Sequence, residues 1–205
     1  MRIRIKICGI TRLRDALTCA ELGIDAIGLV FYERSPRHIE PEAADTIVRR
    51  LPPFMSTVGL FMNADRARVE AVMKAVRLDN LQFHGDESPE FCEQFNIPYI
   101  KAIPMGEDST FSNLVHGYES ASAWLLDSHR RNKAGGSGET FDWLKVPGDA
   151  EKPLILAGGL NADNVQSAIA KVRPYAVDCS SGVEVEPGVK DPEKIRDFME
   201  KVTSV

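Results

Sequence analysis

The chain has 205 residues, of which 43% are hydrophobic and 27% charged, so we expect a single domain with one core over residues 1–205. Its formal net charge of −5 argues against a broad nucleic-acid-binding surface. No segment approaches the roughly 18 continuous apolar residues of a membrane span, and the N-terminal residues lack the apolar core of a signal peptide. The four scattered cysteines form no Cys-x-x-Cys pair, which predicts a cytoplasmic protein with free thiols and no zinc site.

Short apolar runs, rich in β-branched and aromatic residues, recur along the chain and predict strands. Most intervals between them show apolar residues at helical spacing and are long enough for a loop and a helix. The predicted strands are residues 3–7, 26–31, 57–61, 81–83, 99–103, 123–126, 154–157 and 176–179.

Capping residues and prolines mark the predicted helices. Thr11 is the expected N-cap of the first helix and Gly23 its stop, while Pro41 opens the second helix. Residues 109–118 show a shorter helical pattern. The other predicted helices are residues 65–75, 88–95, 161–172 and 191–202.

Alternating strands and helices predict a parallel sheet, and eight such units predict an α/β fold closed into a (β/α)8 barrel, the TIM barrel. The alternative is an open, doubly wound sheet, which usually has fewer units. A Gly-x-Gly-x-x-Gly fingerprint after the first strand would favour the open sheet, but the chain has Cys-Gly-Ile-Thr there. We therefore expect the closed barrel.

Polar residues at the ends of several strands predict an active site. Alternation along the first strand places Ile5 and Ile7 on one face and Lys6 and Cys8 on the other, which would point into the barrel. In a barrel, the C-terminal strand ends surround the active site. A lone aspartate after a strand is usually a turn former, so the prediction depends on several strands agreeing. The candidates at strand ends are Cys8, His84, Asp127 and Asp178.

Two glycine-containing loops predict a phosphate site. The segments LAGGLNADNV and DCSSGVEVEPG each place small residues between a strand and a helix. Glycine lets backbone N–H groups approach an anion closely, and TIM-barrel enzymes often bind a phosphate between the seventh and eighth loops. The candidate phosphate-binding residues are Gly158, Gly159, Ser180, Ser181 and Gly182.

A third glycine cluster, KAGGSGETFDW, follows the sixth strand. It lacks the spacing of a nucleotide-binding loop and fits either a mobile lid over the active site or a solvated loop tip. The preceding HRRNK is typical of a solvated basic face.

Segments along most of the chain closely resemble the phosphoribosylanthranilate isomerase family. The resemblance runs from Lys6 to about Asp191, while residues 105–122 carry little of it. Phe83 and Cys179 stand where aliphatic residues are expected. The segments are KICGIT, GLVFYERSPR, VGLFMN, QFHGDES, LLDS…GGSGETFDW, LAGGLNADNV and VDCSSGVEVEPGVKD.

The resemblance implies a cofactor-free, metal-free enzyme of tryptophan biosynthesis. Such an enzyme converts N-(5-phosphoribosyl)anthranilate to 1-(2-carboxyphenylamino)-1-deoxy-D-ribulose 5-phosphate, an Amadori rearrangement from an aldose to a ketose. By resemblance, Cys8 is the general base, Asp127 the general acid, and Arg37 holds the anthranilate carboxylate. The implied partner is a phosphorylated small molecule, and neither nucleic acid, membrane nor an obligate protein partner is implied.

The two proton-transfer groups each need a shifted pKa. A cysteine titrates near about 8.5, and Lys6 could lower the pKa of the Cys8 thiol, or could instead pair with a carboxylate in the barrel. Asp127 must carry a proton as an acid, which burial and a neighbouring Asp178 would favour, unless Asp178 only braces the eighth loop. His84 could touch the substrate or hold the fourth loop.

Two other functions remain open on the sequence. A barrel isomerase of histidine biosynthesis performs the same rearrangement on an aminoimidazole ribotide, but that family has an aspartate in place of Cys8 and a longer barrel with two phosphate sites. A non-catalytic barrel that binds a phosphorylated ligand is the other alternative, although it would not need both Cys8 and Asp127.

Overall fold

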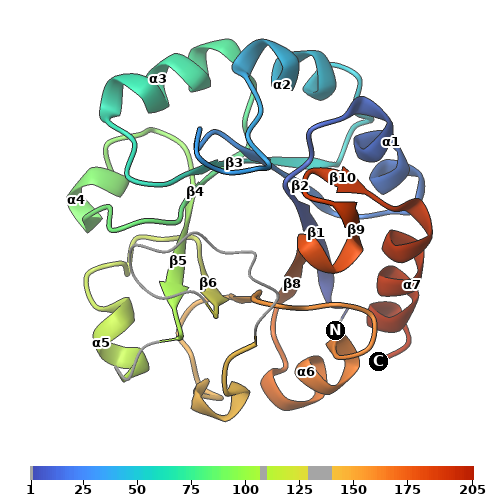
Figure 1. Cartoon of the computed structure of the whole chain (residues 1–205). Coiled ribbons are helices and arrows are strands. Elements are labelled where there is room, and N and C mark those ends of the chain that lie inside the picture. Colours follow the sequence, from blue (N-terminus) through green and yellow to red (C-terminus); the bar gives the residue numbers. More distant parts are fainter. Residues whose placement is uncertain (1, 107–109, 129–139) are drawn as a thin grey trace.

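Eight parallel strands close into a barrel, which Figure 1 shows along its axis. The computed structural model describes residues 2–106, 110–128 and 140–205. Pairing of the first strand with the eighth closes the ring and excludes the open sheet, so the predicted (β/α)8 barrel is confirmed. The strands are β1 (Arg4–Cys8), β2 (Ala26–Val30), β3 (Ser56–Phe61), β4 (Asn80–Phe83), β5 (Tyr99–Pro104), β6 (Ala123–Asp127), β7 (Leu154–Leu156) and β8 (Ala176–Cys179).

The helices surround the barrel, as Figure 1 shows. Prolines open α2, α4 and α7, where the missing N–H costs no hydrogen bond. The side chains of Asp65 and Asp191 cap α3 and α7 by accepting backbone N–H groups. The helices are α1 (Leu13–Glu21), α2 (Pro41–Val48), α3 (Arg66–Ala75), α4 (Pro89–Cys92), α5 (Phe111–Val115), α6 (Val165–Val172) and α7 (Pro192–Thr203).

Several predicted helix boundaries are wrong. Thr11 does not cap α1: the N-cap is Arg12, and the Thr11 hydroxyl donates to the carbonyl of Gly188, far along the chain. The fourth helix ends at Cys92 rather than at residue 95. The sixth begins at Val165 because the Asn161 side chain holds the preceding residues in a turn.

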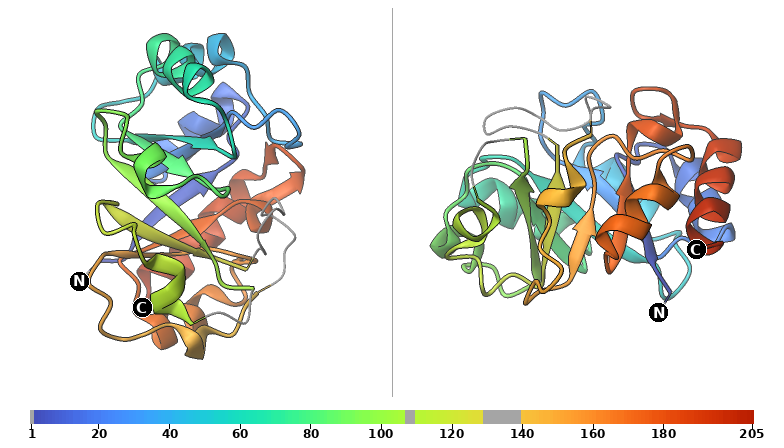
Figure 2. Two further views of the ribbon diagram at one scale, coloured as in Figure 1. Left: turned by 90° about the vertical axis from the view of Figure 1, so that its left-hand side faces the viewer. Right: turned by 90° about the horizontal axis from the view of Figure 1, so that it is seen from below.

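Four short elements were not predicted from the sequence. The described part of the segment between β6 and β7 contains a 3₁₀ helix, η1 (Trp143–Lys145), and no α-helix. After β8 come a second 3₁₀ helix, η2 (Ser181–Val183), and an antiparallel hairpin of β9 (Glu184–Glu186) and β10 (Val189–Lys190). In the right-hand view of Figure 2, this hairpin and the blue loop after β2 lie at the same end of the barrel, opposite the N-terminus.

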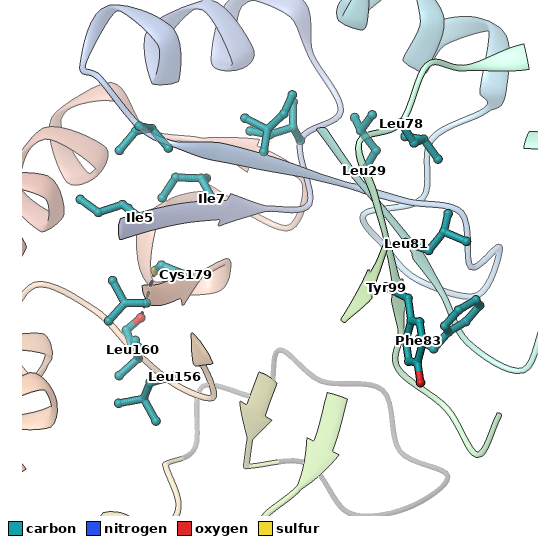
Figure 3. Packing of buried hydrophobic residues seen from close by; sticks show 14 of the residues in the cluster. Ile5, Ile7, Leu29, Leu78, Leu81, Phe83, Tyr99, Leu156, Leu160 and Cys179 are labelled. Atoms are coloured by element: carbon teal, nitrogen blue, oxygen red, sulfur yellow. Dashed lines mark hydrogen bonds between the residues drawn. The ribbon is translucent and has the colours of Figure 1, made fainter. Parts of the chain in front are cut away.

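The main hydrophobic core lies between the barrel and the helices (Figure 3). Ile5 and Ile7 of β1 belong to it, as the predicted strand alternation requires. Phe83 is fully buried and packs against Phe91, Phe95 and Tyr99 with ring centroids 5.7–5.9 Å apart, which explains an aromatic residue where an aliphatic one was expected. Each such aromatic pair contributes about 0.5–1.5 kcal/mol beyond its buried area.

Smaller residues fill the middle of the barrel. They form a second hydrophobic cluster, comprising Val58, Ile100, Ala102, Ala123, Leu125, Ile155, Ala157 and Ala176. This packed layer separates the two ends of the barrel, so a site at the C-terminal strand ends has a closed floor. In the described part of the chain, no helix is long and apolar enough to cross a membrane.

Candidate active site

A pocket lies at the C-terminal ends of the barrel strands, where the sequence analysis placed the active site. Nearly all the predicted site residues come together there, contributed by strands and loops far apart in the sequence. Those that line it are Cys8, Arg37, His84, Asp127, Gly158, Gly159, Asp178, Ser180 and Ser181.

Gly182 and Lys6 are the predicted site residues that do not line the pocket. Gly182 fits against the loop after β7, because a Cβ there would lie only 2.1 Å from the carbonyl oxygen of Leu160. The absence of a side chain at Gly182 therefore lets the seventh and eighth loops pack closely. Lys6 precedes Cys8 by two residues on β1 and contacts Asp178, which lines the pocket.

Cys8 ends β1 and faces Gly28 of β2, its partner in the strand register. A Cβ on Gly28 would lie 2.7 Å from the Cys8 sulfur and 3.1 Å from Lys6 Nζ. The thiol and the ammonium group therefore flank the same point, and only glycine leaves room for both. Gly28 is a residue that the sequence analysis missed.

Burial raises the pKa of the Cys8 thiol, and the positive charge of Lys6 offsets this only in part. Lys6 therefore lowers the pKa of Cys8, as one predicted alternative states, but burial outweighs it and the net shift is upward. The other predicted alternative is also observed: Lys6 Nζ lies 2.8 Å from Asp178 Oδ2, in an ion pair with both side chains at most 7% exposed. Burial lowers the pKa of Lys6, but Asp178 and Cys8 raise it by more, so Lys6 stays charged.

Asp178 links this ion pair to the pocket. Its Oδ2 binds Lys6, whereas its Oδ1 is buried without a hydrogen-bond partner among the described residues. Burial raises the pKa of Asp178, Lys6 opposes that shift, and the charge of Asp127 adds to it. Asp178 thus brings its ion pair with Lys6 to the wall of the pocket.

Asp127, the last residue of β6, lies beside His84 of the loop after β4. Asp127 Oδ2 is 3.6 Å from His84 Nε2, and Gln82 Nε2 is 3.1 Å from His84 Nδ1. The Ser128 hydroxyl donates to Asp127 Oδ1 at 3.4 Å. His84 was expected either to contact the substrate or to hold the fourth loop. Its place beside Asp127 indicates a third role, which is to orient the Asp127 carboxylate.

Arg37 is held by a carboxylate that the sequence analysis missed. Its Nε and Nη2 donate to the two oxygens of Glu184 at 2.9 and 2.8 Å, a bidentate pair. Lys190 Nζ donates to the same carboxylate at 2.7 Å and to the Cys8 carbonyl at 2.6 Å. The sequence does contain a signal for the hairpin that carries Glu184 and Lys190. Charged residues alternate with valines on both sides of Pro187, a pattern typical of a hairpin.

The candidate phosphate-binding loops lie at one side of this pocket. Gly158 and Gly159 have positive φ angles of 78° and 65°, and a Cβ on Gly158 would lie 2.5 Å from the backbone N of Ser128. Only glycine fits there without strain. The Ser180 hydroxyl donates to the Cys8 carbonyl at 3.0 Å, which ties the eighth loop to the end of β1.

The predicted lid falls largely on residues 133–139, and HRRNK on residues 129–133, which lie outside the described residues. Among residues 140–143 at the end of this segment, Asp142 caps η1 by accepting from the Leu144 N–H. In the described ranges, no group of three His, Cys, Asp or Glu side chains could hold a metal ion.

Comparisons with known proteins identify the family of this chain. A model of N-(5'-phosphoribosyl)anthranilate (PRA) isomerase matches residues 5–201. The chain is 54% identical over 203 residues to the N-(5'-phosphoribosyl)anthranilate isomerase of Stutzerimonas stutzeri, covering 99% of this chain and 98% of the relative. Two phosphoribosyl anthranilate isomerase crystal structures also match, and each covers 99% of this chain and is itself covered completely. The Thermotoga maritima enzyme has a TM-score of 0.88 at 40% identity, and a complex with reduced 1-(o-carboxyphenylamino)-1-deoxyribulose 5-phosphate has 0.82 at 39%. This chain therefore belongs to the N-(5'-phosphoribosyl)anthranilate isomerase family, the aldose–ketose isomerases of tryptophan biosynthesis.

Proposed function

We propose that this chain converts N-(5'-phosphoribosyl)anthranilate to 1-(2-carboxyphenylamino)-1-deoxy-D-ribulose 5-phosphate, with Cys8 as general base and Asp127 as general acid. The observation that carries the proposal is the position of these two residues. They end β1 and β6, strands on well-separated parts of the ring, and both line the same pocket. A substrate lying between them could receive a proton on one side and lose one on the other.

Asp127 acts first in this mechanism. Its carboxylic acid gives a proton to the ring oxygen of the ribose, the bond between C1 and that oxygen breaks, and the nitrogen lone pair forms a C=N⁺ iminium. His84 and Ser128 contact the two oxygens of Asp127 and hold it toward the pocket. No electrons leave the substrate, so the step needs only a positioned acid.

Cys8 acts second. Its thiolate removes the proton from C2, and the C–H electrons move to form a C1=C2 double bond while the iminium nitrogen becomes neutral. The resulting enolamine then tautomerises: C1 gains a proton, the C2 hydroxyl loses one, and the ketone forms. The Lys6 ammonium beside the sulfur stabilises the thiolate, which burial otherwise disfavours.

The rest of the pocket suits the two ends of this substrate. Arg37 presents a guanidinium to the anthranilate carboxylate, and Gly158, Gly159, Ser180 and Ser181 line the part where the phosphate would bind. Asp178 also lines the pocket, where it either binds the substrate or supports the residues that do.

The test is the loss of fluorescence of the anthranilate ribotide when purified protein is added. Cys8→Ala and Asp127→Asn are expected to abolish most turnover while substrate binding is retained, because each removes one proton transfer. Cys19→Ala, which replaces another buried cysteine outside the pocket, is the matched control and should keep activity. Turnover of an aminoimidazole ribotide instead, or near-normal activity of Cys8→Ala, would contradict the proposal.

A further inference from the structure

The buried carboxylate of Glu184 connects Arg37, through Lys190, to the end of β1. Glu184, the first residue of β9, is 7% exposed and accepts hydrogen bonds from Arg37, Lys190 and the Gly188 N–H. Lys190 itself is 1% exposed. Neither Glu184 nor Lys190 lines the pocket, so neither can be reached by a substrate seated in it.

The contact with Glu184 fixes which edge of Arg37 remains available. A guanidinium has two edges that can hold a carboxylate with paired hydrogen bonds. Glu184 occupies the Nε and Nη2 edge, and Nη1 has no hydrogen-bond partner among the described residues. The edge formed by Nη1 and Nη2 is therefore left for a second carboxylate.

The stem of Arg37 is fixed as well. A Cβ on Gly9, whose φ is +79°, would lie 2.5 Å from Arg37 Cδ and 3.2 Å from its Cβ. The methylene chain therefore lies directly on the Gly9 backbone, immediately after Cys8. With the stem on Gly9 and one edge on Glu184, the guanidinium has a single orientation.

Lys190 joins this carboxylate to the end of β1. Its Nζ donates to the Cys8 carbonyl at 2.6 Å and to the Ser180 carbonyl at 3.2 Å, in addition to Glu184. The backbone of Lys190 is itself anchored, because its N–H donates to Asp15 Oδ2. Lys190 and Arg37 therefore both hold Glu184, and both donate to its Oε1 atom.

Arg37, Glu184 and Lys190 together carry a net positive charge, which favours an anionic ligand. Burial alone would raise the pKa of Glu184, but the hydrogen bonds and charges of Arg37 and Lys190 outweigh it and hold that pKa below its ordinary value. One carboxylate therefore stands between two buried cations, and the cluster carries one net positive charge. A substrate carboxylate on Arg37 would neutralise it.

We propose that Glu184, held in place by Lys190, is a positioning residue that sets the specificity for the aromatic carboxylate of the substrate by orienting Arg37. This inference rests on the proposed function. Glu184 thereby determines how strongly the enzyme prefers a carboxylated aromatic ring to an uncarboxylated one, although Glu184 itself contacts neither ring.

The test compares two ligands with two matched variants. The ligands are the reduced product analogue, reduced 1-(o-carboxyphenylamino)-1-deoxyribulose 5-phosphate, and its counterpart made from aniline, which lacks the carboxylate. The variants are Glu184→Gln and Glu186→Gln; Glu186 lies on the same strand but is exposed. Affinities are measured by calorimetry, and turnover by the fluorescence assay.

Glu184→Gln is expected to lower the affinity for the carboxylated analogue about tenfold. The affinity for the aniline counterpart should change by no more than about twofold, since only the carboxylate depends on the orientation of Arg37. The KM should rise similarly while kcat falls much less. Glu186→Gln should behave as wild type. In an Arg37→Met background, Glu184→Gln should cause no further loss of discrimination.

Equal weakening of both ligands would assign Glu184 a structural role and overturn the proposal, as would unchanged affinity for the carboxylated analogue. If Glu184→Gln does not fold, Glu184→Asp keeps the charge but withdraws the carboxylate by one methylene, and it is expected to show a smaller loss of the same kind. Equal affinities of wild type for the two ligands would again overturn the proposal. Absence of turnover in the wild type would instead refute the proposed function.

Discussion

The Cys8 sulfur occupies space that only a glycine at position 28 can leave open. Cys8 and Gly28 are partners in the register of β1 and β2, and a Cβ on Gly28 would lie 2.7 Å from the sulfur. The same Cβ would lie 3.1 Å from Lys6 Nζ and 3.1 Å from the Cys8 Cα. Because one of these neighbours is backbone, the strand pair cannot absorb a methyl group by side-chain motion alone.

Gly28→Ala is therefore expected to lower kcat about tenfold to a hundredfold, because the thiol must move away from the reacting carbon. The free energy of unfolding should fall by about 1–3 kcal/mol, as for other overpacked cores. Fluorescence turnover and urea unfolding measure the two effects. Gly148→Ala, where a Cβ has nothing within 4 Å, is the control. Wild-type kcat in Gly28→Ala would show that the thiol does not need this position.

Lys6→Met should raise the pKa of Cys8 further, because the Lys6 charge is the main influence that lowers it. Alkylation of Cys8 by iodoacetamide, followed by mass spectrometry over a range of pH, measures the shift. The same variant leaves Asp178 buried without its partner, which should cost about 3–5 kcal/mol of stability.

The double variant Lys6→Met/Asp178→Asn separates these effects. It removes the uncompensated buried charge, so it should recover much of the stability lost in Lys6→Met. It should recover the reactivity of Cys8 only in part, because the charge of Asp178 also raises the pKa of the thiol, whereas the larger lowering effect of Lys6 stays lost. An alkylation profile identical to that of the wild type in Lys6→Met would refute a role for Lys6 in stabilising the thiolate.

The barrel and most pocket residues could be predicted because they follow from local periodicity. A period of two places Lys6 and Cys8 on the inward face of β1, and closure of the barrel then brings Cys8 and Asp127 to one end. Gly158 and Gly159 could be predicted as turn residues because glycine is the residue that readily adopts positive φ angles, and both have such angles in the structure.

The residues that were missed depend on contacts between segments far apart in the sequence. Glu184 meets Arg37 only because the hairpin after β8 folds over the loop after β2. Gly28 matters only through the register of β1 and β2. The sign of the Cys8 pKa shift also needs the structure, since residue order shows the nearby lysine but not the extent of burial.

The buried thiols should make the protein less stable in alkali. Burial raises the pKa of Cys19, Cys92 and Cys179 to about 12, against about 8.5 for an exposed thiol. Between these values the unfolded chain loses protons that the folded chain keeps, so stability is complete below about pH 8.5 and falls as pH rises toward 12. At pH 10 each such thiol should cost on the order of 1–2 kcal/mol.

Urea unfolding at pH 7, 9 and 10 checks this expectation. Cys19→Ala should be less stable than wild type at pH 7, because it leaves a small cavity, but should lose less stability between pH 7 and pH 10. Val69→Ala, which also truncates a fully buried side chain without removing a titrating group, should keep the wild-type pH slope. Equal slopes in Cys19→Ala and wild type would contradict the prediction for Cys19.

A further buried ion pair, between Lys101 and Glu87, holds the loop that carries His84. Glu87 accepts hydrogen bonds from Lys101 Nζ at 2.9 Å, from the Gly85 N–H at 2.9 Å and from the Asn63 N–H at 2.7 Å. Glu87→Gln should therefore cost about 3–5 kcal/mol of stability, because it leaves Lys101 buried without its counterion.

The same substitution should also lower kcat by a smaller factor than Cys8→Ala, because His84 stands beside Asp127 at the start of this loop. Glu90→Gln, in the first turn of α4 and exposed, is the matched control and should change stability far less than Glu87→Gln. Lys101→Met in the Glu87→Gln background should recover part of the lost stability, since it removes the unpaired cation. If Glu87→Gln proves as stable as Glu90→Gln in urea, the three contacts of Glu87 do not support the loop.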